Sequence, residues 1–282
     1  MIVITGASGQ LGRLVIEELL TSVPANQIIA AVRTPAKVAD LAARGVVVRQ
    51  ADYTHPATLD AAFDGATQIL LISSSEIGQR LPQHQNVIAA AKRANVSLLA
   101  YTSLLHADTS PLGLAAEHVA TEQALKASGL PYAILRNGWY TENYTASIPP
   151  ALQYGVLLGS AGDGKIASAT RSDYAAAAAA VLRTPNQAGK VYELAGDTAY
   201  TLTEFAAELT RLSGKAIAYQ NLPQADYAKA LLDAGLPDFL ADLLADSDTG
   251  ASKGALFDDS HQLSQLIGRP TTPLATAIAA AL

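Results

Sequence analysis

Short apolar runs alternate with segments of helical period through the first half of the chain. The predicted strands cover residues 2–5, 28–32, 46–49, 68–72, 98–102 and 132–135. The predicted helices between them cover residues 11–20, 37–43, 58–63, 87–94 and 115–128. This alternation is typical of an α/β fold, and unbroken apolar strands fit a parallel sheet that helices cover on both faces. Right-handed crossovers then bring the carboxyl ends of the strands to one edge, where ligands bind.

The alternation stops after Arg136. Two prolines, Pro149 and Pro150, and the glycines between residues 155 and 164 interrupt regular structure. The later segments predict further helices, which cover an alanine-rich stretch from Ser172 or Asp173, then residues 203–213 with Thr201 or Thr203 as cap, 227–232 and 239–244. We therefore predict a Rossmann-type doubly wound parallel sheet in residues 1–137. Residues 138–282 form a smaller, mainly α C-terminal lobe, with some segments returning to the Rossmann core.

Composition excludes several classes of function. The 282 residues hold 19 basic and 25 acidic side chains, a net charge of −6, and no basic run, so nucleic-acid binding lacks its electrostatic footprint. The chain has no cysteine, which excludes disulfides, thiolate metal sites and cysteine nucleophiles. No apolar stretch reaches the roughly 18 residues of a membrane span, and the strand pattern begins at once, so we expect a cytoplasmic protein without membrane insertion.

The opening stretch M-I-V-I-T-G-A-S-G-Q-L-G carries glycines at intervals of three between a predicted strand and a predicted helix. In a dinucleotide-binding turn, Gly6 lets the chain turn sharply, Gly9 lets a pyrophosphate approach the backbone, and Gly12 lets the helix pack close to the sheet. The phosphates would lie at the helix N-terminus, where unpaired N–H groups favour anions. A plain tight turn is the alternative. The G-x-x-G-x-x-G spacing resembles the short-chain dehydrogenase/reductase superfamily.

The end of the second strand discriminates between cofactors. An acidic residue there would accept a hydrogen bond from the ribose 2′-OH of NAD, but this chain has Arg33. A guanidinium pairs with a 2′-phosphate and stacks on adenine, and Lys37 is a second cation nearby. We therefore predict NADP(H) as the cofactor; a solvated surface arginine is the alternative.

Two further stretches follow strands of the predicted sheet. Asp52 and Tyr53 end the third strand, where the superfamily resemblance implies a contact of Asp52 with the adenine amino group. Ser73, Ser74 and Ser75 end the fourth strand, where small hydroxyl side chains admit the nicotinamide ribose and offer it hydrogen bonds. An ordinary serine-rich loop is the alternative.

The Tyr-x-x-x-Lys pair of the superfamily is missing from the helix that should carry it. That helix reads A-A-E-H-V-A-T-E-Q-A-L from Ala115, with His118 where related atypical members often carry lysine. Ser103 resembles the superfamily's active-site serine, without the tyrosine partner. The acid for alcohol and ketone chemistry is therefore absent.

A more specific resemblance covers nearly the whole chain. It is carried by the stretches Q-A-D-Y, L-L-I-S-S-S-E-I-G-Q-R, Y-T-S-L-L-H-A-D-T-S-P-L-G-L-A, L-R-N-G-W-Y-T-E-N-Y, G-D-G-K-I-A-S-A-T-R-S-D-Y-A and D-T-G-A-S-K-G-A-L-F-D-D-S. They resemble the bacterial NAD(P)H:quinone oxidoreductases, which are NmrA-like atypical short-chain dehydrogenases/reductases. The resemblance implies a flavin-free reductase that uses NADPH to reduce quinones, with residues 1–137 binding NADP(H) and residues 138–282 binding substrate.

The expected cofactor contacts combine the turn, the strand ends and the resemblance. They are Gly6, Ala7, Ser8, Gly9, Gln10, Leu11, Gly12, Arg33, Asp52, Tyr53, Ser73, Ser74, Ser75, Asn137, Gly138, Trp139, Tyr140, Thr141, Glu142 and Arg171. The stretch from Asn137 to Glu142 would lie beside the nicotinamide.

Quinone reduction is a reaction that does not need the missing tyrosine. A quinone is a strong electrophile that becomes aromatic on reduction, so hydride transfer needs mainly proximity and a dry, oriented pocket. His118 and Tyr140 are the candidates for orienting the carbonyl or donating the proton. A surface pair of His118 with Glu122, and an aromatic wall of Tyr140 with Trp139, are the alternatives. Asn143 and Tyr144 are further candidates for lining the pocket.

Other sites and functions complete the expectations. His84 and His106 lack partners at metal-site spacing, so we expect no metal. The partner is a small-molecule quinone, with no nucleic acid and no membrane; a homodimer stays open, because nothing in the chain shows an interface. An NADP(H)-sensing regulator without catalysis, and a reductase of ketones or cationic dyes, are the alternative functions.

Overall fold

The computed structural model describes residues 1–282 as two compact units. The first unit comprises Met1–Asp108, Leu114–Asn137 and Arg171–Glu193, and the second comprises Thr109–Gly113, Gly138–Thr170 and Leu194–Leu282. No helix of the chain combines the length and the apolar character that crossing a membrane requires.

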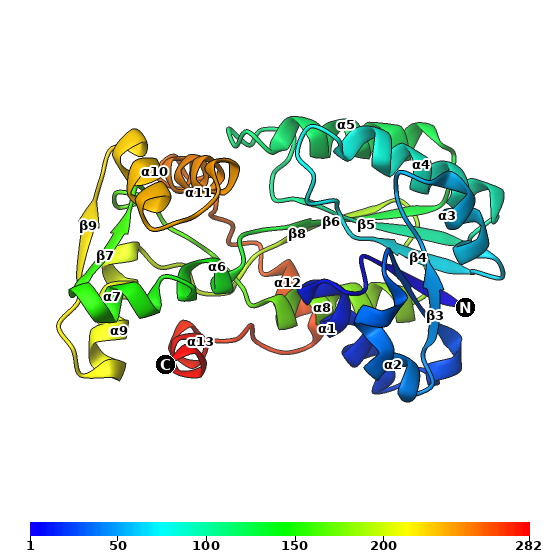
Figure 1. Ribbon diagram of the computed structural model, residues 1–282, viewed down its shortest axis with the longest axis horizontal. Helices are drawn as coiled ribbons and strands as arrows, with labels where there is room; N and C mark the ends of the chain where they lie inside the picture. Colours follow the sequence, from blue (N-terminus) through cyan, green and yellow to red (C-terminus); the bar gives the residue numbers. More distant parts are fainter. The chain divides into compact units, whose positions relative to one another are not determined.

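The first unit is built on a seven-stranded sheet with the order β3-β2-β1-β4-β5-β6-β8 (Figure 1). Its strands are β1 (Ile2–Thr5), β2 (Ile28–Val32), β3 (Val47–Gln50), β4 (Gln68–Leu71), β5 (Leu98–Leu104), β6 (Tyr132–Asn137) and β8 (Lys190–Leu194). The strands from β1 to β6 pair in parallel, and the order reverses direction beside β1, as in a doubly wound sheet. The predicted Rossmann-type fold is confirmed.

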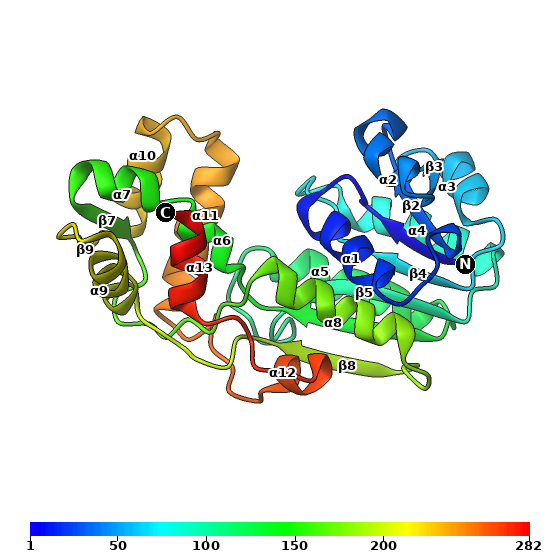
Figure 2. The ribbon, with the colours of Figure 1, turned by 90° about the horizontal axis from the view of Figure 1, so that it is seen from below.

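Helices cover both faces of this sheet, so its inner strands β2 and β5 are buried throughout. The helices are α1 (Gln10–Leu20), α2 (Ala39–Ala43), α3 (Pro56–Phe63), α4 (Arg80–Arg93), α5 (Ala115–Ala127) and α8 (Arg171–Arg183), with 3-10 turns η1 (Ala25–Gln27) and η2 (Pro35–Val38). In Figure 1, α3, α4 and α5 lie on one face, and α1 and α8 lie on the other. The alanines of α8 are buried against α1, beside which it runs in Figure 2, because small side chains let two helices approach closely.

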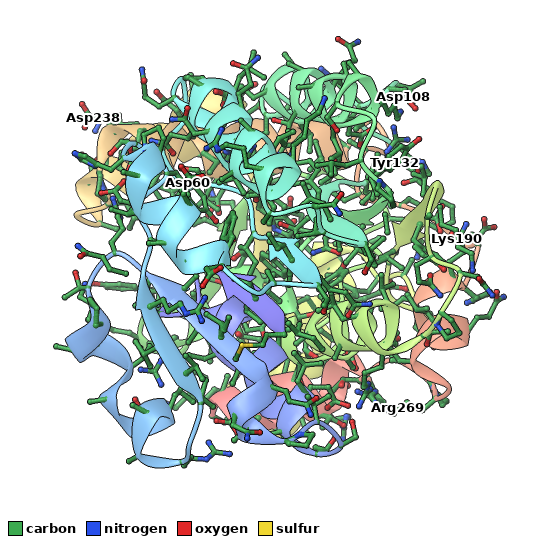
Figure 3. All side chains as sticks on the ribbon, turned by 90° about the vertical axis from the view of Figure 1, so that its right-hand side faces the viewer. Asp60, Asp108, Tyr132, Lys190, Asp238 and Arg269 are labelled. Atoms are coloured by element: carbon green, nitrogen blue, oxygen red, sulfur yellow. The ribbon has the colours of Figure 1, made fainter.

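Strand β8 was absent from the predicted strands. It is an edge strand whose first residues, Lys190 and Val191, are exposed, so it lacks the continuous apolar run of the buried strands. The Gly189 N–H donates to the Tyr132 carbonyl at 2.7 Å, which pairs the start of β8 with the start of β6. Tyr132 and Lys190 accordingly lie near each other in Figure 3.

The second unit is mainly α, as predicted, with one small sheet. Its helices are α6 (Thr141–Thr145), α7 (Ile148–Tyr154), α9 (Leu202–Ser213), α10 (Gln224–Asp233), α11 (Asp238–Ala251), α12 (Gln262–Ile267) and α13 (Leu274–Ala281). Its parallel strands are β7 (Val156–Gly159) and β9 (Ala218–Asn221), which the prediction missed. Thr201 caps α9: its hydroxyl accepts from the Glu204 N–H, while the Glu204 carboxylate accepts from the Thr201 N–H.

Several helix boundaries differ from the prediction. Helix α4 begins at Arg80 rather than at residue 87. The helix tolerates Pro82 because this residue lies in the first turn, where no N–H group has a partner within the helix. Helix α8 begins at Arg171 rather than at Ser172 or Asp173. Helix α11 runs to Ala251, well beyond the predicted residue 244.

Candidate functional site

The turn between β1 and α1 is held by its backbone. Gly6 has a φ of +59°, which side chains disfavour, and its carbonyl accepts from the Gly9 N–H at 2.9 Å. A Cβ on Gly12 would lie 2.6 Å from the Gly6 oxygen and 2.8 Å from the Ala7 Cα. No side chain caps the N-terminus of α1, so the first N–H groups of this helix remain available to an anion.

A groove of about 270 Å³ opens beside this turn, at the carboxyl ends of β1, β2 and β4. We refer to it as the groove; its lining residues are Gly6, Ser8, Gly9, Ala31, Val32, Arg33, Ala51, Asp52, Tyr53, Ile72, Ser73, Ser74, Ser75, Glu76 and Gln83. The edge at which a doubly wound sheet reverses its strand order is where such folds bind nucleotides.

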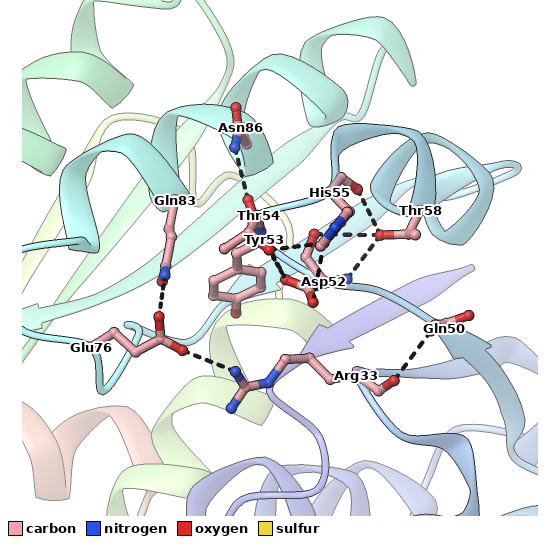
Figure 4. A network of polar contacts seen from close by, with 10 residues as sticks. All are labelled: Arg33, Gln50, Asp52, Tyr53, Thr54, His55, Thr58, Glu76, Gln83 and Asn86. Atoms are coloured by element: carbon pink, nitrogen blue, oxygen red, sulfur yellow. Dashed lines mark hydrogen bonds and ion pairs between the residues drawn. The ribbon is translucent and has the colours of Figure 1, made fainter.

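Arg33 lies at the groove, directly after β2, and is paired across it (Figure 4). Its NH1 donates to the Glu76 Oε1 at 2.9 Å, and the Gln83 amide donates to the Glu76 Oε2 at 2.6 Å. The Arg33 side chain is 67% exposed and the Glu76 side chain 43% exposed, so water reaches this pair. Lys37, the second predicted cation, does not line the groove.

Asp52 and Tyr53 form the wall of the groove that follows β3. The Asp52 Oδ1 accepts from the N–H and the hydroxyl of Thr54, at 2.8 Å and 2.7 Å. Burial alone would raise the pKa of Asp52, but the bonds from Thr54, together with His55, outweigh it and hold this pKa below its usual value. The Tyr53 hydroxyl bonds to the Thr5 hydroxyl and donates to the Ile72 carbonyl at 2.9 Å, which ties the ends of β1, β3 and β4 together.

The serine run after β4 is anchored by buried side chains. The Ser73 N–H donates to the Thr102 hydroxyl and the Ser74 N–H to the His84 Nε2, both at 2.9 Å, while the Arg80 Nε donates to the Ser74 carbonyl at 2.6 Å. Burial, together with the charge of Arg80, lowers the pKa of His84 to about 3, so this imidazole is neutral. The run is therefore a fixed loop at the groove.

His118 is buried and bonds to Tyr101, with 2.7 Å between its Nδ1 and the phenol oxygen. The alternative of a surface pair between His118 and Glu122 is wrong. The Glu122 carboxylate accepts two bonds from the Arg136 guanidinium, at 2.9 Å and 2.7 Å, and one from the Ser103 hydroxyl at 2.6 Å. Burial, with the charge of Arg80, lowers the pKa of His118 to about 3. Its ring is neutral at physiological pH.

The stretch beyond β6 is divided between the two units. Asn137 ends β6 in the first unit, and its buried Oδ1 has no hydrogen-bond partner in the protein. Arg171 begins α8 in the same unit. The segment from Gly138 to Glu142 belongs to the second unit, where Tyr140 pairs with Ala169 and the Thr141 N–H donates to the Ala169 carbonyl at 2.9 Å.

Helix α6, which follows this segment, is held by side chains. The Tyr144 phenol donates to the Asp248 Oδ1 at 2.9 Å, and the Ser160 N–H donates to the Asp248 Oδ2 at 2.9 Å. The Thr141 hydroxyl lies 2.8 Å from the Ser168 hydroxyl, which lies 2.6 Å from the Tyr200 phenol. Burial raises the pKa of Asp248 to about 6, against the lowering effect of the bonds from Ser160 and Tyr144.

The structure thus gathers part of the predicted set in one place. Residues Gly6, Ser8, Gly9, Arg33, Asp52, Tyr53, Ser73, Ser74 and Ser75 share the groove. Residues Ala7, Gln10, Leu11 and Gly12 build the turn and helix beside it without lining it. No group of three or more histidine, aspartate or glutamate side chains is arranged to hold a metal ion.

Glu76 and Gln83 also line the groove and were missed by the sequence analysis. Glu76 directly follows the serine run, and this position was a signal that could have identified it as a residue of the groove. Gln83 is polar but buried, and only the true start of α4 at Arg80 brings it to the groove.

Comparison with known proteins gives a consistent picture. A family model described as NAD(P)H-binding matches residues 6–185. Quinone oxidoreductase 2 of Escherichia coli (strain K12) is 66% identical over 278 residues, which cover 99% of this chain and 97% of the relative.

Two solved structures superpose over almost the full length. The NADPH-dependent quinone oxidoreductase of Escherichia coli in complex with NADPH matches with a TM-score of 0.97 and 65% identity, covering 99% of both chains. The triphenylmethane reductase of Citrobacter sp. complexed with NADP(H) matches with a TM-score of 0.96 and 38% identity, covering 100% of both chains.

Proposed function

The chain belongs to the NAD(P)H-binding family, and from that premise we propose that it is an NADPH-dependent oxidoreductase that transfers a hydride directly from nicotinamide to a quinone. The observation that carries the proposal is the near-full-length similarity to the Escherichia coli quinone oxidoreductase. The groove beside the glycine turn, with Arg33 at its rim, supports the same cofactor.

Features of this chain fit the cofactor. The glycines let the turn fold tightly, since a Cβ on Gly9 or Gly12 would meet the Gly6 carbonyl, and the turn leads into the uncapped N-terminus of α1, which favours an anion. Arg33 supplies a guanidinium for the 2′-phosphate, and Ser73 to Ser75 supply hydroxyls for a ribose. The unpartnered Oδ1 of Asn137 offers an acceptor for a carboxamide N–H. The remaining predicted contacts, from Gly138 to Glu142 and Arg171, stay part of this proposal.

When bound, the reduced nicotinamide supplies the hydride. The chain's own task is to hold the quinone in a dry pocket and to direct one proton to the reduced oxygen, because hydroquinone formation takes up a hydride and a proton. His118 and Tyr140 are the proposed groups for orienting the carbonyl or supplying the proton. Because the His118 ring is neutral, it would act as a hydrogen-bond donor to the carbonyl rather than as an imidazolium acid.

The finer assignments belong to the same proposal. Residues 1–137 would bind NADP(H), and residues 138–282 would form the substrate-binding lobe. A cytoplasmic location is the expected setting. A homodimer stays open as the assembly, and sedimentation of the purified protein tests it.

The test is an acceptor panel with NADPH and NADH side by side. We expect the purified protein to oxidise NADPH when a benzoquinone or a naphthoquinone is added, and to do so more slowly with NADH. A ketone and a cationic triphenylmethane dye complete the panel, with the protein-free reaction as control. Quinone-dependent oxidation no faster than this control would contradict the proposal, and a clear preference for the dye would reassign the substrate class.

A further inference from the structure

The Glu76 carboxylate pairs with one terminal nitrogen of the Arg33 guanidinium (Figure 4). One carboxylate oxygen of Glu76 accepts from the Arg33 NH1 at 2.9 Å, and the other accepts from the Gln83 amide at 2.6 Å. Gln83 is buried, whereas Arg33 and Glu76 are both partly open to water. The carboxylate is therefore held between a fixed amide on α4 and a solvent-facing guanidinium after β2.

The backbone on both sides of Glu76 is anchored independently of this pair. On one side, Ser74 is held by His84 and Arg80. On the other side, the Gly78 N–H donates to the Glu117 Oε1 at 2.9 Å. A turn of the Glu76 side chain alone would therefore release Arg33, without moving the loop that carries the serine run.

A carboxylate and a phosphate use the same guanidinium N–H donors. The proposed function gives Arg33 a 2′-phosphate as ligand, so the phosphate and Glu76 would meet at one cation. Two anions at that place repel each other as well as share donors. The ribose of NADH carries no 2′-phosphate, so it does not compete with Glu76 for the Arg33 guanidinium.

We propose that Glu76 is the resident counter-ion of Arg33, which the 2′-phosphate of NADPH displaces and which NADH leaves in place. Glu76 thereby lowers the affinity for NADPH. The preference for NADPH over NADH is then smaller than the one that Arg33 would set without Glu76. This inference rests on the proposed function, since it takes NADPH as the ligand of the groove.

The test measures binding, not turnover. Dissociation constants for NADPH, NADH and adenosine 2′,5′-bisphosphate are determined by titration calorimetry at low ionic strength, for the unaltered protein and for Glu76→Gln. Glutamine keeps the size of the side chain and removes its charge. Because an exposed ion pair is worth little, we expect about two- to fivefold tighter binding of the two 2′-phosphorylated ligands, and a smaller change for NADH.

Glu17→Gln is the matched control. Glu17 forms an exposed ion pair with Arg44 in the same unit, with comparable exposure of both side chains, and it does not line the groove. This variant removes the same charge, so its affinity for all three ligands should equal that of the unaltered protein. In an Arg33→Ala background, the effect of Glu76→Gln should disappear.

The outcomes separate the inference from the function on which it rests. NADPH binding that is unchanged or weaker in Glu76→Gln overturns the inference alone, because Glu76 would then be neutral or would organise Arg33 for the phosphate. An equal gain in Glu17→Gln also overturns it, since net charge would explain the effect. Failure of the unaltered protein to bind NADPH overturns the proposed function, and the inference with it.

Discussion

Two segments of this chain hold their shape by opposite means. The turn after β1 is fixed by its backbone and by the absence of side chains at Gly6 and Gly12. Helix α6, in the second unit, is fixed by buried side chains, in which Tyr144 donates to Asp248. The first segment holds no titratable group, so its shape should not depend on pH. The second depends on a buried carboxyl whose pKa is raised to about 6, so its stability should change within the physiological range.

The largest expected effect concerns the backbone-held turn. In Gly12→Ala, the new Cβ would lie 2.6 Å from the Gly6 oxygen, so the turn and the start of α1 must move apart. We expect the free energy of unfolding to fall by about 3 kcal/mol. Gly9→Ala is the control, because its Cβ would lie 3.2 Å from the same oxygen. Chemical denaturation measures the free energy of unfolding of both variants. Equal losses would show that the close approach of Gly12 to the Gly6 carbonyl does not fix the turn.

The next effect concerns Asp248 and pH. Because the folded-state pKa of Asp248 is raised above its unfolded value of about 3.9, its contribution to stability is fully present below about pH 4 and is lost as the pH rises through about 6. Asp248→Asn removes this dependence and can keep both hydrogen bonds, with its amide donating to Tyr144. Relative to the unaltered protein, the variant should gain about 2 kcal/mol between pH 4.5 and pH 7.5.

Asp242→Asn is the control for this measurement, since Asp242 is an exposed carboxylate on the same helix. The comparison with a variant is needed because His84 and His118, with pKa values lowered to about 3, act in the opposite direction. These two residues remove stability as the pH falls below about 6.5. Parallel curves for Asp248→Asn and the unaltered protein would mean that Asp248 does not titrate in this range.

The smallest effect concerns the phenol that holds α6. Tyr144→Phe leaves Asp248 with one donor fewer, and a hydrogen bond to a charged group contributes about 1.5–3 kcal/mol. We expect a loss near 2 kcal/mol at pH 7.5 and about half of it at pH 4.5, where the carboxyl is protonated. Tyr200→Phe, which removes a bond between neutral hydroxyls, should cost about 1 kcal/mol at both pH values. The same loss in both variants at every pH would contradict a charged partner for Tyr144.

The contrast also explains what could be predicted from the sequence. The glycine turn was found because strand β1, the turn and helix α1 follow one another within a few residues, and strand β2 was found as an unbroken apolar run. Arg33 was found for the same reason, since it directly follows that strand. In such local patterns, glycines and apolar runs mark where each element begins and ends.

Features assembled from distant segments were not predictable. Asp248 lies 104 residues from Tyr144, and no local pattern marks it as a buried carboxyl. The first residues of α4 include Arg80, Gln83 and His84, which are buried because they bind neighbouring groups rather than because they are apolar. Their polarity concealed the start of the helix, and with it the residue that holds Glu76.

The most direct test of the account is the binding of both cofactors to Arg33→Ala. If the guanidinium holds the 2′-phosphate, its loss should raise the dissociation constant for NADPH by about tenfold or more, because a charge-assisted contact contributes about 1.5–3 kcal/mol. The dissociation constant for NADH should change by no more than about twofold, and the free energy of unfolding should be preserved, since Arg33 pairs only at the surface. Equal losses for NADPH and NADH would contradict the account, because Arg33 would then not distinguish the phosphorylated cofactor.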